Sequence, residues 1–163
     1  INTVLVKGFN DDEIEALAGL TEKEEIDVRF IELMPIGVTA KDELNGFISN
    51  DIVLKKLPEL IKVEREDPSS PALYYKLPNA RGKIGLINPI SCKFCKYCNR
   101  VRLTAQGSLK LCLHSNEEIN LKVALKSGQD IESIIINAID KKPQSHNLED
   151  KKYVTKNMYQ IGG

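Results

Sequence analysis

Hydrophobic and polar residues alternate in two distinct periods along the first part of the chain. Residues 3–6 are apolar and largely β-branched, which predicts a buried strand. Asn10, with Glu13 three residues later, has the form of a helix-capping box. A helix is then predicted by residues at helical spacing: Ile14, Leu17, Ala18 and Thr21.

A second strand is predicted over residues 26–34, because Val28, Phe30 and Glu32 alternate with the residues between them. Pro35 and Gly37 end this pattern. Strand, helix and strand with short connections form a βαβ unit, so we expect the two strands to be parallel.

The middle of the chain has a different pattern. Ser49 or Asn50 is placed to cap a short helix that ends near Pro58, and residues 67–71 have the composition of a loop. Strands with tight turns between them are predicted at 73–77, 83–87, 100–105 and 108–113. Gln106 and Gly107 lie between the last two strands at hairpin distance, so we expect this stretch to be antiparallel.

The last part of the chain contains one amphipathic helix, which Asp130 is placed to cap. Its apolar residues are Ile131, Ile134, Ile135, Ala138 and Ile139. Residues 140–163 show no periodicity, and we expect an extended tail there. The sequence therefore predicts an α/β beginning followed by an α+β region.

Composition narrows the function classes. The chain has 163 residues, with 23 basic and 23 acidic side chains and a net charge of zero, which argues against a general nucleic-acid or membrane-surface binder. No apolar run reaches the length of about 20 residues that a membrane span needs, and no signal peptide is visible. The chain begins with Ile rather than Met, so we expect it to be part of a longer protein.

Four cysteines lie close together, and they carry most of the functional information. Cys92, Cys95, Cys98 and Cys112 all fall within 21 residues, whereas a disulfide-stapled secreted domain usually spreads its cysteines over a much shorter chain. This clustering favours metal ligation in a reducing cytoplasm. Spacing alone leaves two candidates equally open: a structural zinc site with Cys92 as fourth ligand, or an iron–sulfur cluster.

Sequence motifs around these cysteines resemble a known family. Phe94-Cys95-Lys96-Tyr97-Cys98-Asn99-Arg100-Val101-Arg102-Leu103-Thr104, followed by Cys112-Leu113, is similar to the C-terminal part of molybdenum cofactor biosynthesis protein A, a family of radical S-adenosylmethionine GTP cyclases. Residues 8–14, 28–37 and 82–87 and the final Gln160-Ile161-Gly162-Gly163 also resemble this family, in the same order.

The resemblance implies roles for individual residues. Cys95, Cys98 and Cys112 would ligate a second [4Fe–4S] cluster, whose open iron contacts the guanine of GTP. Arg100, Val101 and Arg102 would bind GTP, although Arg-x-Arg pairs are usually ordinary surface charge.

Further roles implied by the resemblance concern S-adenosylmethionine and the chain end. Met34 and Arg29 would lie at the S-adenosylmethionine site. The alternatives are core packing for Met34 and a salt bridge for Arg29. Gly162 and Gly163 would form a double-glycine tail that reaches into the active site. His114 and His146 have no ligand spacing to the cysteines, and we expect them at the surface or in loops.

The resemblance also implies an architecture and partners. Residues 1–40 would be the C-terminal end of an incomplete TIM-like barrel, and residues 41–163 the cluster- and GTP-binding region. The radical motif Cys-x-x-x-Cys-x-x-Cys is absent from this chain, so the first [4Fe–4S] cluster and S-adenosylmethionine chemistry would need the N-terminal half of the enzyme. We expect this chain alone to be inactive.

Cys92 is a second departure from the family pattern, and its thiolate would compete for the open iron or promote zinc binding or a disulfide. Expected partners are GTP, the N-terminal half, a second copy in a homodimer and the enzyme that processes the cyclised product, with no nucleic acid and no membrane. The competing hypothesis is a stand-alone zinc-binding interaction domain.

Overall fold

The computed structural model describes residues 1–40, 45–92, 94–146, 148 and 153–161. The chain forms two compact units. The first combines Ile1–Met34 with Leu44–Cys98, and the second combines Pro35–Glu43 with Asn99–Gly163.

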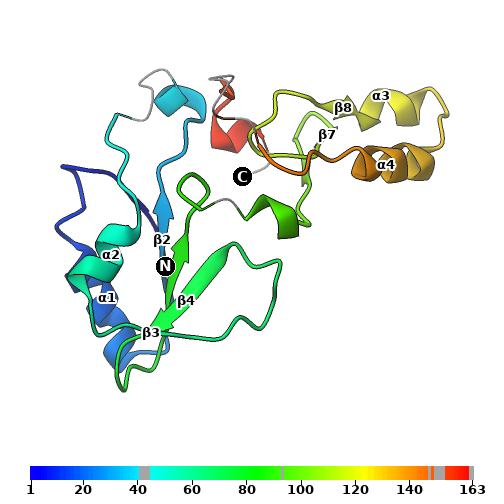
Figure 1. The fold of residues 1–163 in the computed structure, drawn as a ribbon. Helices are drawn as coiled ribbons and strands as arrows, with labels where there is room; N and C mark the ends of the chain where they lie inside the picture. Colours follow the sequence, from blue (N-terminus) through cyan, green and yellow to red (C-terminus); the bar gives the residue numbers. More distant parts are fainter. Residues whose placement is uncertain (41–44, 93, 147, 149–152, 162–163) are drawn as a thin grey trace. The chain divides into compact units, whose positions relative to one another are not determined.

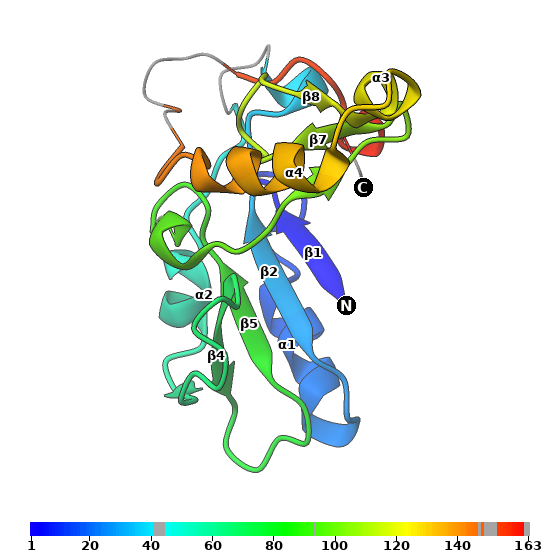
Figure 2. The same cartoon turned by 90° about the vertical axis from the view of Figure 1, so that its right-hand side faces the viewer.

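A mixed five-stranded sheet forms the first unit, in the order β1-β2-β5-β4-β3. Its strands are β1 (Asn2–Leu5), β2 (Val28–Glu32), β3 (Ile61–Lys62), β4 (Ala72–Lys76) and β5 (Ile84–Ile87). The strands β1, β2 and β5 are parallel, and β4 and β3 continue the sheet antiparallel. Figure 2 shows β1, β2, β5 and β4 side by side. The parallel βαβ prediction is confirmed, whereas the middle stretch is only partly antiparallel because β5 joins β2 in parallel.

Two helices, α1 (Ile14–Lys23) and α2 (Asp51–Lys56), lie along one face of this sheet (Figure 1). Alternation along β2 buries Val28, Phe30 and Glu32, while Arg29 and Ile31 are only partly covered. The apolar core between sheet and helices includes Leu5, Ile14, Ala18, Val28, Phe30, Val53, Ile84 and Leu86. The period-2 pattern therefore gives the correct buried face of β2.

Helix capping differs from the prediction. The structure begins α1 after Glu13, and no side chain caps it. Asn10 instead accepts a hydrogen bond from the Val6 amide at 2.9 Å and donates to the Val4 carbonyl at 3.0 Å. The capping-box prediction is wrong because Asn10 stabilises the turn that follows β1. Ser49 does accept a hydrogen bond from the Asp51 amide at the start of α2.

The second unit contains a small antiparallel sheet and two helices. Its strands, in the order β6-β7-β8, are β6 (Arg102–Leu103), β7 (Ser108–Lys110) and β8 (Ile119–Asn120). The helices are α3 (Leu121–Lys126) and α4 (Ile131–Asp140). The predicted hairpin and the Asp130 cap are confirmed, since Asp130 accepts from the amides of Glu132 and Ser133. Sequence patterns missed β3, β8 and α3, which span two to six residues each.

Part of the expected tail is packed rather than extended. Val154 pairs with Ile36 in a parallel bridge, and both Val154 and Ile161 are buried. Among the described residues of this unit, Gly37–Ala40 (η1) and Met158–Gln160 (η4) form 3-10 turns. Isolated apolar residues in a non-periodic segment gave no sequence signal for this packing. Among the described helices, none combines the length and apolarity needed to cross a membrane.

Two glycines provide a matched test of this fold. A Cβ added at Gly82 would lie 1.9 Å from the Ile26 carbonyl oxygen, whereas a Cβ at Gly19, inside α1, would meet nothing within 4 Å. We predict that Gly82→Ala lowers the free energy of unfolding by about 1–3 kcal/mol or more. Gly19→Ala should raise it by about 0.5–1 kcal/mol. Urea denaturation measures both, and equal effects would contradict this packing.

Candidate metal centre

Cys95 and Cys98 lie at the two ends of a single tight turn in the first unit. The 3-10 helix η2 (Cys95–Tyr97) ends at Cys98, whose amide donates to the Cys95 carbonyl at 3.0 Å. Side chains at positions i and i+3 of a 3-10 turn lie on the same side of the helix. Both thiols are free and half-buried. Two partly covered thiols on one side of a turn fit a thiolate-bound zinc ion or iron–sulfur cluster.

The other two cysteines differ in place and exposure. Cys112 follows β7 in the second unit and is a half-buried free thiol, while Cys92 in the first unit is exposed. Among the described residues of either unit, no group of three or more His, Cys, Asp or Glu side chains is close enough to hold a metal ion.

The two arginines do not share a regular strand. Arg100 and Val101 precede β6, and only Arg102 belongs to it, so the prediction of a strand over 100–105 is too long. Arg102 lies opposite Lys110 in the β6–β7 register. Arg100 is exposed and Arg102 half-buried.

A lysine at the end of α4 connects the arginine segment to the cysteine segment of the second unit. Lys142 Nζ donates to the carbonyl oxygen of Arg100 at 2.6 Å and to that of Leu111 at 2.5 Å. Leu111 directly precedes Cys112. This ammonium group therefore holds together the backbone beside Arg100 and the backbone beside Cys112.

Arg29 lies on the face of the sheet opposite the helices. It stands beside Gly85 in register, and its Cγ is 3.0 Å from the place that a Cβ on Gly85 would take. Among the described residues, its Nε is buried and has no hydrogen-bond partner. A buried guanidinium nitrogen without an acceptor is costly, so this side chain is suited to an anionic ligand.

The remaining predicted residues lie at the ends of elements. Met34 lies two residues beyond the end of β2 and is partly exposed. Carboxyl ends of parallel strands are the usual place for ligands in α/β folds, which agrees with a ligand role for Met34. Gly162 and Gly163 lie outside the described residues.

Sequence patterns did not identify Glu32 as a functional candidate. This carboxylate ends β2 and is completely buried. It accepts hydrogen bonds from the amides of Ile90 at 3.0 Å and Ser91 at 2.9 Å, just before the cysteine segment. The available signal was a charged residue in register with Val28 and Phe30 on the buried side of a strand.

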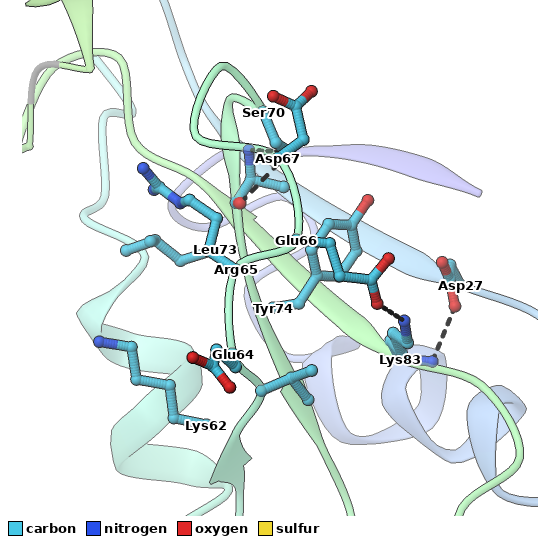
Figure 3. Close-up of a pocket in the computed structure, with 12 residues that line it drawn as sticks. Asp27, Lys62, Glu64, Arg65, Glu66, Asp67, Ser70, Leu73, Tyr74 and Lys83 are labelled. Carbon is cyan, nitrogen blue, oxygen red and sulfur yellow. Dashed lines mark hydrogen bonds and ion pairs between the residues drawn. The ribbon is translucent and has the colours of Figure 1, made fainter. Parts of the chain in front are cut away.

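A cavity of the first unit runs along β4 and has a volume of about 810 Å³ (Figure 3). Its charged lining comprises three cations and four carboxylates: Lys62, Arg65, Lys83, Asp27, Glu64, Glu66 and Asp67. Lys83 Nζ lies 3.6 Å from Glu66 and its amide donates to Asp27 at 2.8 Å. A lining with more carboxylates than cations does not suit a polyphosphate, so this cavity is not the nucleotide site we favour.

Two histidines of the second unit lie in loops, as expected, but neither is an exposed surface side chain. His146 is buried, and His114 is half-buried with its ring 4.8 Å from that of His146, in edge-to-face contact. Burial, followed by the nearby charges of His146, Lys110 and Arg102, lowers the pKa of His114 to about 4. Their loop positions gave no pattern from which this burial could be predicted.

The His114 pKa gives a pH prediction. In the unfolded chain this pKa is about 6.5, so between pH 6.5 and 4 the unfolded state binds a proton that the folded state excludes. The free energy of unfolding should therefore fall by roughly 3 kcal/mol as pH is lowered through this window. Above pH 6.5 this contribution is fully present. His114→Phe should remove this part of the slope in urea titrations at several pH values, and parallel slopes would contradict the assignment.

Comparison with known proteins identifies the family. The sequence model of the family described as Molybdenum Cofactor Synthesis C matches residues 26–148. Relatives described as GTP 3',8-cyclase from Peptoclostridium acidaminophilum and from Clostridium botulinum (strain Hall) are 57% and 51% identical over 100% of this chain. A third, from Alkaliphilus metalliredigens, is 46% identical. The chain covers 50%, 51% and 52% of these relatives, so it spans about half the length of the curated relatives it matches. The chain belongs to the Molybdenum Cofactor Synthesis C family.

Proposed function

We propose that this chain is the C-terminal half of a GTP 3',8-cyclase, a cytoplasmic radical S-adenosylmethionine enzyme of molybdenum cofactor biosynthesis. The observation that carries the proposal is the Cys95–Cys98 turn with Arg100 and Arg102 directly after it. Relatives that carry the name GTP 3',8-cyclase match over the whole chain and support it.

The metal ligands in this proposal are Cys95, Cys98 and Cys112. Three thiolates leave one iron of a [4Fe–4S] cluster without a protein ligand. When bound, the cluster would supply a Lewis-acidic iron that orients the guanine base of GTP. The tight turn at Cys95–Cys98 supports this assignment, because side chains three residues apart in such a turn lie on the same side of it.

GTP would be held by charged side chains that follow Cys98 closely in the sequence. Arg100 and Arg102 supply planar guanidinium groups that bind phosphate in a fork, and Val101 lies between them. These groups bind and orient the substrate, so that a ribose radical attacks the correct carbon.

S-adenosylmethionine and the first cluster would be supplied mainly by the other half of the enzyme, with Met34 and Arg29 contributing from this chain. The strand β1 lies at one edge of the described sheet, and this edge is suited to pair with a further strand of a TIM-like barrel. Gly162 and Gly163 would extend into the active site. This chain alone should not cleave S-adenosylmethionine, because only Cys92 remains for a cluster that needs three thiolates.

Metal analysis tests the ligand assignment. After anaerobic reconstitution, the protein should hold about four irons per chain in a [4Fe–4S] centre bound by Cys95, Cys98 and Cys112. Changing Cys98 to Ser should abolish this iron, while Cys92→Ser, the matched control, should leave it unchanged. Zinc without iron in the wild type would favour a structural zinc domain instead, and equal iron loss in both variants would make Cys92 a ligand.

GTP binding tests the arginines. In the full-length enzyme, Arg100→Ala or Arg102→Ala should each remove a charge-assisted hydrogen bond of ~1.5–3 kcal/mol. Affinity measured by calorimetry should then fall on the order of tenfold to a hundredfold. Arg102→Lys should recover little, because lysine lacks the planar fork. Lys96, an exposed cation in the same segment, is the control. If Lys96→Ala weakens binding as much as the arginine variants, only general charge is involved.

A further inference from the structure

A buried carboxylate anchors the chain just before the cysteine turn. Both oxygens of Glu32 are engaged: Oε2 accepts from the amides of Ile90 and Ser91, and Oε1 accepts from the Ser91 hydroxyl and, at 3.4 Å, from the Asn50 amide. An ionised carboxylate has about four acceptor sites. The donors present therefore match its full capacity.

No cation accompanies this buried charge. Glu32 forms no ion pair with a Lys, Arg or His side chain among the residues that the structure describes. A buried carboxylate without a cation is costly unless hydrogen bonds replace its hydration. Three of its four donors belong to Ile90 and Ser91, so this short segment has to stay in place for Glu32 to be tolerated.

Asn50 fixes the same segment from its other end. This buried side chain places Nδ2 within 3.1 Å of three acceptors: the carbonyl oxygens of Phe30 and Ile87 and Oδ1 of Asn88. The Cys92 amide then donates to the Asn88 carbonyl at 3.3 Å. Residues 88–92 are thus held against the carboxyl ends of β2 and β5 by polar groups at both ends.

The distance from this anchor to the thiols is short. Cys95 lies four residues after Ser91, and an extended chain covers at most about 3.6 Å per residue. Phe94 and Tyr97 of the turn line a cavity of about 160 Å³ together with Leu73 and Leu86 of the sheet. Metal-binding side chains need placement within about 0.5 Å, which a freely moving loop does not provide.

We propose that Glu32 is a positioning residue for the Cys95–Cys98 thiolate pair. It does not contact the metal; it fixes residues 90–91, and this fixed base sets where the cysteine turn begins. The inference rests on the proposed function, because it takes these thiols to be metal ligands. A carboxylate suits the task because a single oxygen accepts from two successive backbone amides.

Three variants of the full-length protein test this role. Glu32→Ala removes all four acceptor contacts, and Glu32→Asp keeps the charge but withdraws it by one methylene group. Glu32→Gln still accepts from the Ile90 and Ser91 amides through Oε1, and the Ser91 hydroxyl is able to turn and accept from Nε2. Only the 3.4 Å contact with the Asn50 amide is lost. Val28→Ala is the matched control, because Val28 is completely buried at the opposite end of β2.

Two measurements are made on each reconstituted protein: the rate at which a chelator removes iron, after subtraction of the iron that a Cys98→Ser protein still holds in the first cluster, and hydrogen exchange at the amides of Ile90 and Ser91. We expect Glu32→Ala and Glu32→Asp to lose iron roughly tenfold faster or more, as is typical for residues that support metal ligands. Amide exchange at both positions should rise with it. Glu32→Gln should stay close to the wild type, and Val28→Ala should change neither quantity, although it lowers stability.

The outcomes separate this inference from the proposed function. Suppose that the wild type holds iron, and that Glu32→Asp loses this iron no faster than the wild type does. If a folded Glu32→Ala protein behaves in the same way, the positioning role is wrong and the cluster assignment stands. If Val28→Ala also loses iron faster than the wild type, Glu32 affects iron retention only through the overall stability of the fold, and the inference is wrong. If the wild type takes up no iron, zinc is used as the probe with the same variants, and binding of neither metal would overturn both proposals.

Discussion

The central strand β2 has to satisfy two opposite requirements, and the arrangement of the first unit follows from them. Its inward side packs Val28 and Phe30 into the apolar core, so the strand must be covered by helices on that face. The same side ends in Glu32, a charge that this core cannot accept. The conflict is resolved only by folding a later segment of the chain over the strand end, with its backbone amides directed at the carboxylate.

That solution brings the chemically interesting part of the chain to the ligand end of the sheet. The segment over Glu32 leads directly into Cys92 and the Cys95–Cys98 turn, and Met34 follows the same strand end. Carboxyl ends of parallel strands are where α/β proteins usually bind ligands. The parallel pairing of β2 with β5 therefore places two features at the same end of the sheet: the hydrogen bonds to Glu32 and the start of the cysteine segment.

The residues of the proposed site come from both units of the chain. One unit contributes a thiol pair held by a tight turn, and the other contributes Cys112 together with Arg100 and Arg102. A ligand that binds the folded chain and not the unfolded chain stabilises the folded state by mass action.

Local patterns in the sequence determined the elements with strong periodicity and the identity of the chemical groups. The strand at Val28–Glu32, the helix at Ile131–Asp140 and the Cys95–Cys98 pair were all predictable, because each depends on residues a few positions apart. The burial of His146 and Ile161 and the role of Glu32 were not. Each depends on groups that are distant in the sequence or lie in segments without periodicity. Whether a polar residue ends up exposed, capping a helix or buried among backbone amides is decided by which segment packs against it, and only the tertiary structure supplies that neighbour.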